Sequence, residues 1–472
     1  MAVRSQPEQL RVAFLAYRGN PRSGGQGVYT RFLSRELARL GHQVTVFAGQ
    51  PWPNVAEADG ARLVKVPSLD LYREPDPFRL PGLSELRGWP DFVEVATMLT
   101  GGFPEPRTFS MRAWRLLAGR RQDFDLLHDN QSFGSGVLRF HQAGWPVVGT
   151  CHHPVTVDRL VEMAKATSFG RRLSIRRWYG FVRMQNAVAR QLPRILTVSS
   201  SSRRDIVEQM GVPSSHIAVV PIGTDADHFS PAPAGAAVRV PGRIMTTASA
   251  DVPMKGLAYL LEAVAKLRTE QPEAHLVVVG EPRRATPAQQ AMDRLGLDNV
   301  VTFRPGVSDA ELVQLYREAM VVAVPSLYEG FSLPAVEAMA CQVPVVACSG
   351  GALPEVLGPD GEAAFLVPPG DAGALAAALG RVLGGPTTVG EKMGRAGRRR
   401  VLARFTWARC AGSVVEQYRS VLESGPGPRE PSRSAEQRSQ PLGPRENKPP
   451  RAAPPAPAPK RTRSSPEQSP AR

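Results

Sequence analysis

The 472-residue sequence predicts an α/β fold built from two parallel-sheet units and a C-terminal tail. Short apolar runs alternate with segments of helical period, which is typical of parallel strands covered on both faces by helices. The alternation stops at a Pro- and Ala-rich stretch, residues 230–242, and then starts again. We therefore predict an N-terminal domain (1–230), a hinge (231–242), a C-terminal domain (243–405) and a helix that packs back (406–424).

The first unit begins with an apolar run at 11–17, followed by a Gly-rich loop and a helix predicted over Val28–Leu40. The stretch 52–121 is rich in Pro and less regular, so we expect mostly loops that shape a binding surface there. Further strands of this unit are predicted at 43–49, 125–129, 146–152, 194–199 and 216–221.

The second unit repeats the pattern, with a strand at 243–249 and a helix over 256–268. Ligands of parallel sheets bind beyond the carboxyl ends of the strands, so two facing units predict a site in the cleft between them. Further strands are predicted at 275–281, 299–305, 320–326, 344–349 and 363–369, with helices between them.

Composition excludes several classes of protein. A hydrophobic fraction of 42% excludes wholesale disorder, and no apolar run approaches the ~18 residues of a membrane-spanning helix. The first apolar run is too short for a signal peptide, so we expect a cytoplasmic protein. No CxxC pair is present, and we expect reduced thiols at Cys151, Cys341, Cys348 and Cys410.

The formal net charge of +15 is concentrated in parts of the chain. Residues 425–472 hold 13 Pro, no aromatic residue and a charge of +6, and we expect this tail to be disordered. A basic segment at 171–183 predicts a helix with a cationic and an apolar side. It fits either an anionic membrane surface or a solvated face of a core helix. No zinc spacing or nucleic-acid motif accompanies the charge, so nucleic acid is not an expected partner.

The strongest single feature is the segment EGFSLPAVEAMACQVPVV, residues 329–346. Glu329 lies in the loop after a buried strand, and Ser332 precedes a helix with Pro334 in its first turn. Backbone N–H groups of Gly330, Phe331, Ser332 and Leu333 would face a ligand there. Glu337 follows one turn into the helix, so two carboxylates are offered to hydroxyl groups of one ligand.

The spacing E-x7-E in this context resembles the signature of retaining glycosyltransferases of family four, which have the GT-B fold of two Rossmann-like domains facing a cleft. The resemblance spans residues 11–422 and includes further motifs in the expected order. These motifs are SGGQGVYTRFLSREL (23–37), GTCHH (149–153), ILTVSSSSRRDI (195–206), VVPIGTDADHFSP (219–231) and PMKGLAYLLEA (253–263).

The resemblance implies transfer of a sugar from a nucleoside diphosphate sugar to a hydroxyl acceptor, which could be a sugar, a lipid headgroup or a small molecule, without a metal cofactor. Glu337 would bind the ribose, Glu329 the transferred sugar and Lys255 the diphosphate. His152 would face the sugar, although His153 is adjacent to it. Catalytic roles are thus implied for His152, Glu329 and Lys255, and donor contacts for Gly24, Gly25, Ser249, Lys255, Arg304, Glu329, Gly330, Phe331, Ser332, Leu333 and Glu337.

One position departs from the family pattern. An Arg usually stands about six residues before the Lys, whereas Ser249 stands near that place here. Arg304 or Arg283 is a candidate to replace this cation. The triplet Asp225-Ala226-Asp227 imitates a metal-binding motif, but it lies in the family's G-x-D-x-x-x-F-x-P segment and is interpreted as structural.

Two other functions remain open at this point. One is a binding protein on an inactive transferase fold, and the other is a sugar epimerase or phosphorylase on the same fold. Peripheral contact with the inner face of an anionic membrane is a further hypothesis.

Overall fold

The computed structural model describes residues 8–19, 25–73, 76–233, 239–247, 253–281 and 286–425. The predicted tail, apart from Gly425, lies outside the described residues, as do residues 234–238 of the predicted hinge.

The first domain is built on a parallel sheet with the strand order β3-β2-β1-β4-β5-β6-β7. Every residue of β4 and β5 is buried, as expected for strands that are covered on both faces. The strands are β1 (Arg11–Ala16), β2 (Gln43–Ala48), β3 (Arg62–Lys65), β4 (Leu126–Asn130), β5 (Val147–Cys151), β6 (Arg194–Thr197) and β7 (Ile217–Val219). The α-helices are α1 (Gly25–Arg39), α2 (Trp89–Leu99), α3 (Glu105–Leu117), α4 (Ser135–Gln142), α5 (Val155–Lys165), α6 (Phe169–Trp178), α7 (Val182–Ala189) and α8 (Ser200–Asp205).

The second domain repeats this architecture with the order β10-β9-β8-β11-β12-β13. Strand β11 has the sequence VVAV and is wholly buried. The strands are β8 (Arg243–Thr247), β9 (His275–Val279), β10 (Val301–Arg304), β11 (Val321–Val324), β12 (Val345–Cys348) and β13 (Ala364–Val367). The helices are α9 (Leu257–Leu267), α10 (Pro287–Leu295), α11 (Asp309–Glu318), α12 (Leu333–Ala340), α13 (Leu353–Leu357), α14 (Ala372–Leu383) and α15 (Thr387–Arg404).

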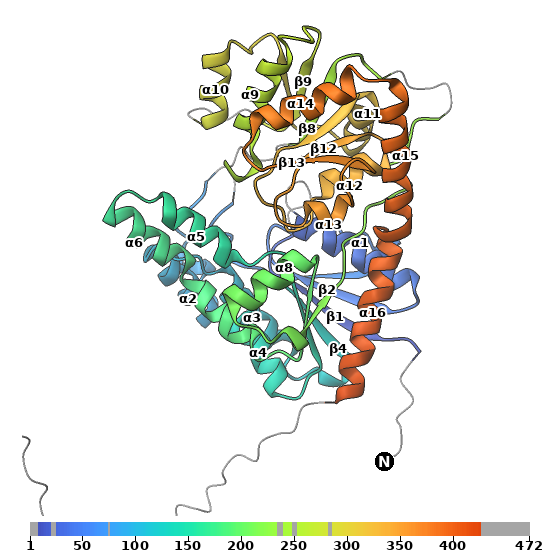
Figure 1. Ribbon diagram of the computed structural model, residues 1–472. Coiled ribbons are helices and arrows are strands. Elements are labelled where there is room, and N and C mark those ends of the chain that lie inside the picture. The colour runs from blue at the N-terminus through green and yellow to red at the C-terminus, as the bar shows by residue number, and fades with distance from the viewer. Residues whose placement is uncertain are drawn as a thin grey trace, which may run out of the picture. The chain divides into compact units, whose positions relative to one another are not determined.

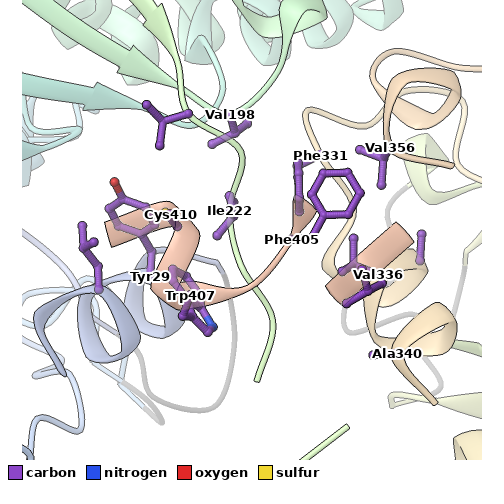
Figure 2. Packing of buried hydrophobic residues seen from close by; sticks show 14 of the residues in the cluster. Tyr29, Val198, Ile222, Phe331, Val336, Ala340, Val356, Phe405, Trp407 and Cys410 are labelled. Carbon is purple, nitrogen blue, oxygen red and sulfur yellow. The ribbon is translucent and has the colours of Figure 1, made fainter. Parts of the chain in front are cut away.

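The chain then returns to the first domain through α16 (Trp407–Ser424), which lies against α1 (Figure 1). Figure 2 shows the buried residues at this crossing. On the second-domain side Phe405 packs edge-on to Phe331 with ring centroids 5.6 Å apart, and on the first-domain side Trp407 lies 6.0 Å from Tyr29. One apolar core therefore continues from one domain into the other.

The stretch 52–121 differs from the expectation of mostly loops, because it contains β3, α2 and α3. Both helices have Pro in their first turn, Pro90 in α2 and Pro106 in α3. A Pro there suits the start of a helix, since the first N–H groups have no partner within the helix, although in sequence it reads as a breaker. Strand β3 is only partly buried and has no alternating pattern.

The basic segment 171–183 is not one helix. Helix α6 ends at Trp178, a 3-10 turn follows, and α7 starts at Val182. The expectation of a cationic side and an apolar side is also only partly met, because Phe169 and Leu173 of α6 are exposed together with its arginines.

All four cysteines are buried and free of disulfide bonds. Within the described ranges no helix has both the length and the apolar content that crossing a membrane requires.

Candidate active site

The strand order of each sheet reverses between two neighbouring strands, β1 and β4 in the first domain and β8 and β11 in the second. Ligands of such sheets bind beyond the carboxyl ends of the strands at that point. In the second domain, Lys255 comes after β8 and the segment 329–333 follows β11. In the first domain, Gly25 comes after β1, Asn130 ends β4 and His152 follows β5. Topology therefore places Lys255, the segment 329–333 and Gly25 at the switch points, and His152 one strand away.

Glu329 is held by two donors from its own domain. Lys255 Nζ lies 2.7 Å from Glu329 Oε1, and Ser326 Oγ donates to the same oxygen at 2.7 Å. The Glu329 side chain is 11% exposed, whereas Lys255 keeps 38% of its side chain exposed. Within the described residues Glu329 Oε2 has no hydrogen bond, so this oxygen is available to a sugar hydroxyl. Lys255 has donors left for an anion.

Glu337 lies on α12 and is partly buried. Burial raises the pKa of Glu337 to about 7, and the Tyr316 hydroxyl, which donates to Oε2 at 2.9 Å, opposes this rise. Tyr316 belongs to α11 and is itself fully buried. A carboxyl group with this pKa changes its charge in the physiological range, and its ability to accept hydrogen bonds changes with it.

The loop between the two glutamates is shaped for a close approach of backbone to ligand. Ser332, the N-cap of α12, has φ of 84°, a left-handed conformation that is uncommon for a residue other than glycine. Its side chain is buried and, within the described residues, its Oγ has no hydrogen-bond partner. A buried hydroxyl without a partner is costly, so a ligand oxygen fits here. The Phe331 side chain packs into the core, which leaves only its backbone for the ligand.

Gly330 is where this loop meets the first domain. Its carbonyl oxygen accepts hydrogen bonds from Ser199 Oγ at 2.7 Å and from Ser202 Oγ at 3.3 Å. A β-carbon at this position would lie 3.1 Å from the His152 carbonyl oxygen, which is tighter than ordinary contact. The structure therefore brings the Gly330 loop and the His152 backbone together.

His152 is oriented by its neighbours in the first domain. Its Nε2 lies 2.8 Å from Asn130 Oδ1, and the Tyr29 ring packs edge-on with centroids 4.5 Å apart. Burial lowers the pKa of His152 to about 4, so the imidazole is neutral at physiological pH and donates its Nε2 proton to Asn130. His153 differs, because its Nε2 lies 3.1 Å from Asp158 in a half-exposed pair. The two adjacent histidines thus have different surroundings.

The structure says less about the remaining predicted donor-site residues. Gly24 and Ser249 lie outside the described residues, as does Arg283. Gly25 is the first residue of α1, with open space where a β-carbon would be. Arg304 ends β10, and the strand order puts β9 and β8 between it and β11.

Asp225 of the triplet at 225–227 has a structural environment. Its carboxylate forms an ion pair with Arg35 at 3.3 Å and accepts a hydrogen bond from the His228 amide. Within the described ranges no group of three or more His, Cys, Asp or Glu residues is placed to hold a metal ion.

Sequence reasoning missed several side chains that hold the predicted ones. Asn130, Tyr316 and Ser326 orient His152, Glu337 and Glu329, respectively. The only usable signal was their position, because Asn130 and Ser326 stand at or just after the carboxyl end of a buried strand. Tyr316 gave no signal, since it reads as an apolar residue of an amphipathic helix.

Comparison with known proteins agrees with this geometry. Residues 23–228 match the model described as Glycosyltransferase Family 4, and residues 237–400 match the one described as Glycosyl transferases group 1. The sequence is 51% identical over 414 residues to an MMP alpha-(1->4)-mannosyltransferase of Mycolicibacterium hassiacum, covering 88% of this chain and 98% of that protein. It is 30% identical to a D-inositol 3-phosphate glycosyltransferase of Kineococcus radiotolerans, covering 87% and 93%. The chain belongs to glycosyltransferase family 4.

Solved structures agree on the fold of this glycosyltransferase. A sucrose-phosphate synthase from Thermosynechococcus elongatus superposes with a TM-score of 0.65 at 23% identity, over 88% of this chain and 100% of that one. HepE of Anabaena, solved in complex with UDP and glucose, gives 0.62 at 18% identity, over 87% and 100%. These likenesses confirm the predicted GT-B fold, and the comparisons do not favour the alternatives of an inactive binding protein or of a sugar epimerase or phosphorylase.

Proposed function

We propose that this glycosyltransferase moves a mannosyl group from a nucleoside diphosphate mannose to a sugar hydroxyl with retention, forming an α-(1→4) linkage. The observation that carries the proposal is the 51% identity to an MMP alpha-(1->4)-mannosyltransferase over 98% of that protein. The paired carboxylates at 329 and 337, bound by Lys255 and Tyr316, supply the matching chemistry.

Each residue has a role in this proposal. Glu337 accepts the ribose hydroxyls, and the free oxygen of Glu329 accepts a hydroxyl of the transferred sugar. Lys255 and the amides of 330–333 stabilise the diphosphate as its negative charge grows in the transition state, which is the main source of rate enhancement in such sites. His152 is neutral and contacts the sugar rather than transferring a proton.

No protein nucleophile is assigned. Glu329 Oε1 is bound by a cation and a hydroxyl, and its Oε2 is assigned to a hydroxyl of the transferred sugar, so neither oxygen is assigned to attack the anomeric carbon. The leaving diphosphate lies on the face of the sugar that the acceptor attacks, and it can take the acceptor's proton. Front-face attack of this kind keeps the anomeric configuration.

Product stereochemistry tests the reaction. The chain is incubated with GDP-, UDP- or ADP-linked sugars and methyl α-mannoside, and the product linkage and anomeric configuration are read by NMR. An α-(1→4) product from an α-linked mannosyl donor is expected. A β product contradicts retention, and transfer of a different sugar in preference to mannose contradicts the assigned donor.

Transfer without a metal ion is also part of the proposal. The diphosphate charge is met by Lys255, by backbone amides and by a second cation for which Arg304 is a candidate. Turnover after treatment with EDTA is expected to match that of the untreated protein. A loss that Mg²⁺ or Mn²⁺ restores argues against this point.

Contact with a membrane is a separate proposal, carried by α6. Phe169 and Leu173, one turn apart, are 81% and 43% exposed, and arginines flank them. We place the protein in the cytoplasm, where its four free thiols remain reduced, with α6 against the inner face of the membrane. Cosedimentation with phosphatidylglycerol vesicles should be weakened by Leu173→Ala but not by Leu402→Ala, which removes a similarly exposed leucine from α15 (43% and 46% exposed, respectively). Equal effects of the two substitutions contradict it.

A further inference from the structure

The first domain has a cavity of about 470 Å³ outside the residues assigned to sugar transfer. Its volume lies within the range of small-molecule sites. Arginines from three helices line it, Arg107 of α3, Arg177 of α6 and Arg183 of α7, together with Phe103, Phe181 and the α4 residue Ser135. No lining residue belongs to the second domain.

The three arginines are exposed and have no acidic partner within the described part of the chain. The cavity wall contains no Asp or Glu. Among the described residues, these guanidinium groups form one hydrogen bond, from Arg177 Nη1 to the Thr100 carbonyl oxygen at 3.1 Å. Three like charges that face one space repel each other, and a bound anion would remove that repulsion.

A second cavity of the same domain gives a useful contrast. It measures about 610 Å³ and is also lined by arginines, but here Arg112 forms ion pairs with Asp91 and Glu94. The charge of that arginine is therefore met within the protein. The unpaired set at 107, 177 and 183 is not explained by a structural role of this kind.

We propose that this cavity is a second ligand site, which binds the phosphate monoester of a phosphorylated sugar. Guanidinium groups bind phosphate oxygens through paired N–H donors. The start of α4, at Ser135, adds the positive end of a helix and a hydroxyl group. Phe103 and Phe181 give the apolar faces on which the carbon face of a sugar ring packs.

A chain of hydrogen bonds connects the arginine-lined cavity to the transfer site. Gln185 lies two residues after Arg183, is buried, and donates to the Gln131 and Ser132 carbonyl oxygens at 3.3 and 3.1 Å. Gln131 Oε1 in turn accepts the His152 amide at 2.8 Å. A ligand that shifts α7 would therefore act on the loop that carries the backbone of His152.

The test measures binding of mannose 6-phosphate and of inorganic phosphate by calorimetry. The full chain is first saturated with a nucleoside diphosphate, so that its donor site cannot bind the probe. Saturable binding is expected, and the double variant Arg107→Gln/Arg183→Gln should weaken it by about tenfold or more, as expected for loss of charge-assisted hydrogen bonds. The matched control Arg139→Gln removes an exposed arginine of α4 outside the cavity and should bind normally.

Three outcomes overturn the proposal. The first is no binding of either probe, and the second is equal binding by the double variant while thermal unfolding shows that it is folded. The third is that phosphatidylglycerol vesicles bind and lose binding in the double variant, whereas mannose 6-phosphate does not bind. In that case the phosphate belongs to a lipid headgroup.

Discussion

The pKa of Glu337 predicts how donor binding depends on pH. Burial raises that pKa to about 7, above its value of about 4.5 in the unfolded chain, so the carboxyl group is mostly neutral at pH 6 and mostly charged at pH 8. A hydrogen bond to a charged group contributes about 1 kcal/mol more than one between neutral groups. Affinity for a nucleoside diphosphate sugar should therefore rise about three- to fourfold from pH 6 to pH 8, because the charged fraction of Glu337 grows from about a tenth to about nine tenths.

Calorimetry with a nucleoside diphosphate sugar is the suitable assay, because its two phosphate charges do not titrate in this range. Glu337→Gln keeps the shape of the side chain and cannot ionise. Its affinity should match that of the protonated native chain and stay flat with pH.

A second substitution tests the cause of the shift. The Tyr316 hydroxyl opposes the rise in the pKa of Glu337, so Tyr316→Phe should raise that pKa further and move the midpoint of the affinity curve to higher pH. The reasoning is refuted if the native chain and Glu337→Gln show the same pH dependence, or if Tyr316→Phe moves the midpoint to lower pH.

Three further tests, two of them paired with a control substitution, separate function from folding. Lys255→Ala should lower turnover by about 10²-fold or more, and near-normal turnover would exclude its role at the diphosphate. His152→Ala should lower kcat on a similar scale, whereas His153→Ala, which removes only a half-exposed pair, should stay within about threefold; equal effects would contradict the assignment. Gly223→Ala places a β-carbon 2.2 Å from the backbone nitrogen of Trp407, at the start of α16, and should reduce the free energy of unfolding by about 2 kcal/mol or more. The control Gly412→Ala has open space around its β-carbon, so the free energy of unfolding measured by urea titration should be equal to or higher than that of the native chain.

Some residues of the candidate site could be predicted from the sequence and others could not. Glu329, Glu337 and Lys255 could be found because their motifs are local and their neighbours in sequence are buried strands or helix starts. Asn130 offered only its position at the end of a buried strand as a signal and Tyr316 offered none, because each acts on a residue 21 or 22 positions away through a contact that only folding creates. The helices at 89–99 and 105–117 were missed for a local reason, since Pro in a first turn looks like a break in sequence.

The sequence by itself determined the two parallel sheets, the carboxylate pair and the family, because strand burial and glycine-rich loops leave periodic and local patterns. Only the tertiary structure decided which charged groups pair with each other and how their surroundings change their ionisation. It paired Lys255 with Glu329, raised the pKa of Glu337 and gave the two adjacent histidines different surroundings. It also brought arginines from three separate helices to one cavity, which no local pattern could indicate. These properties depend on burial and on distances between segments far apart in the chain, and a linear sequence contains neither.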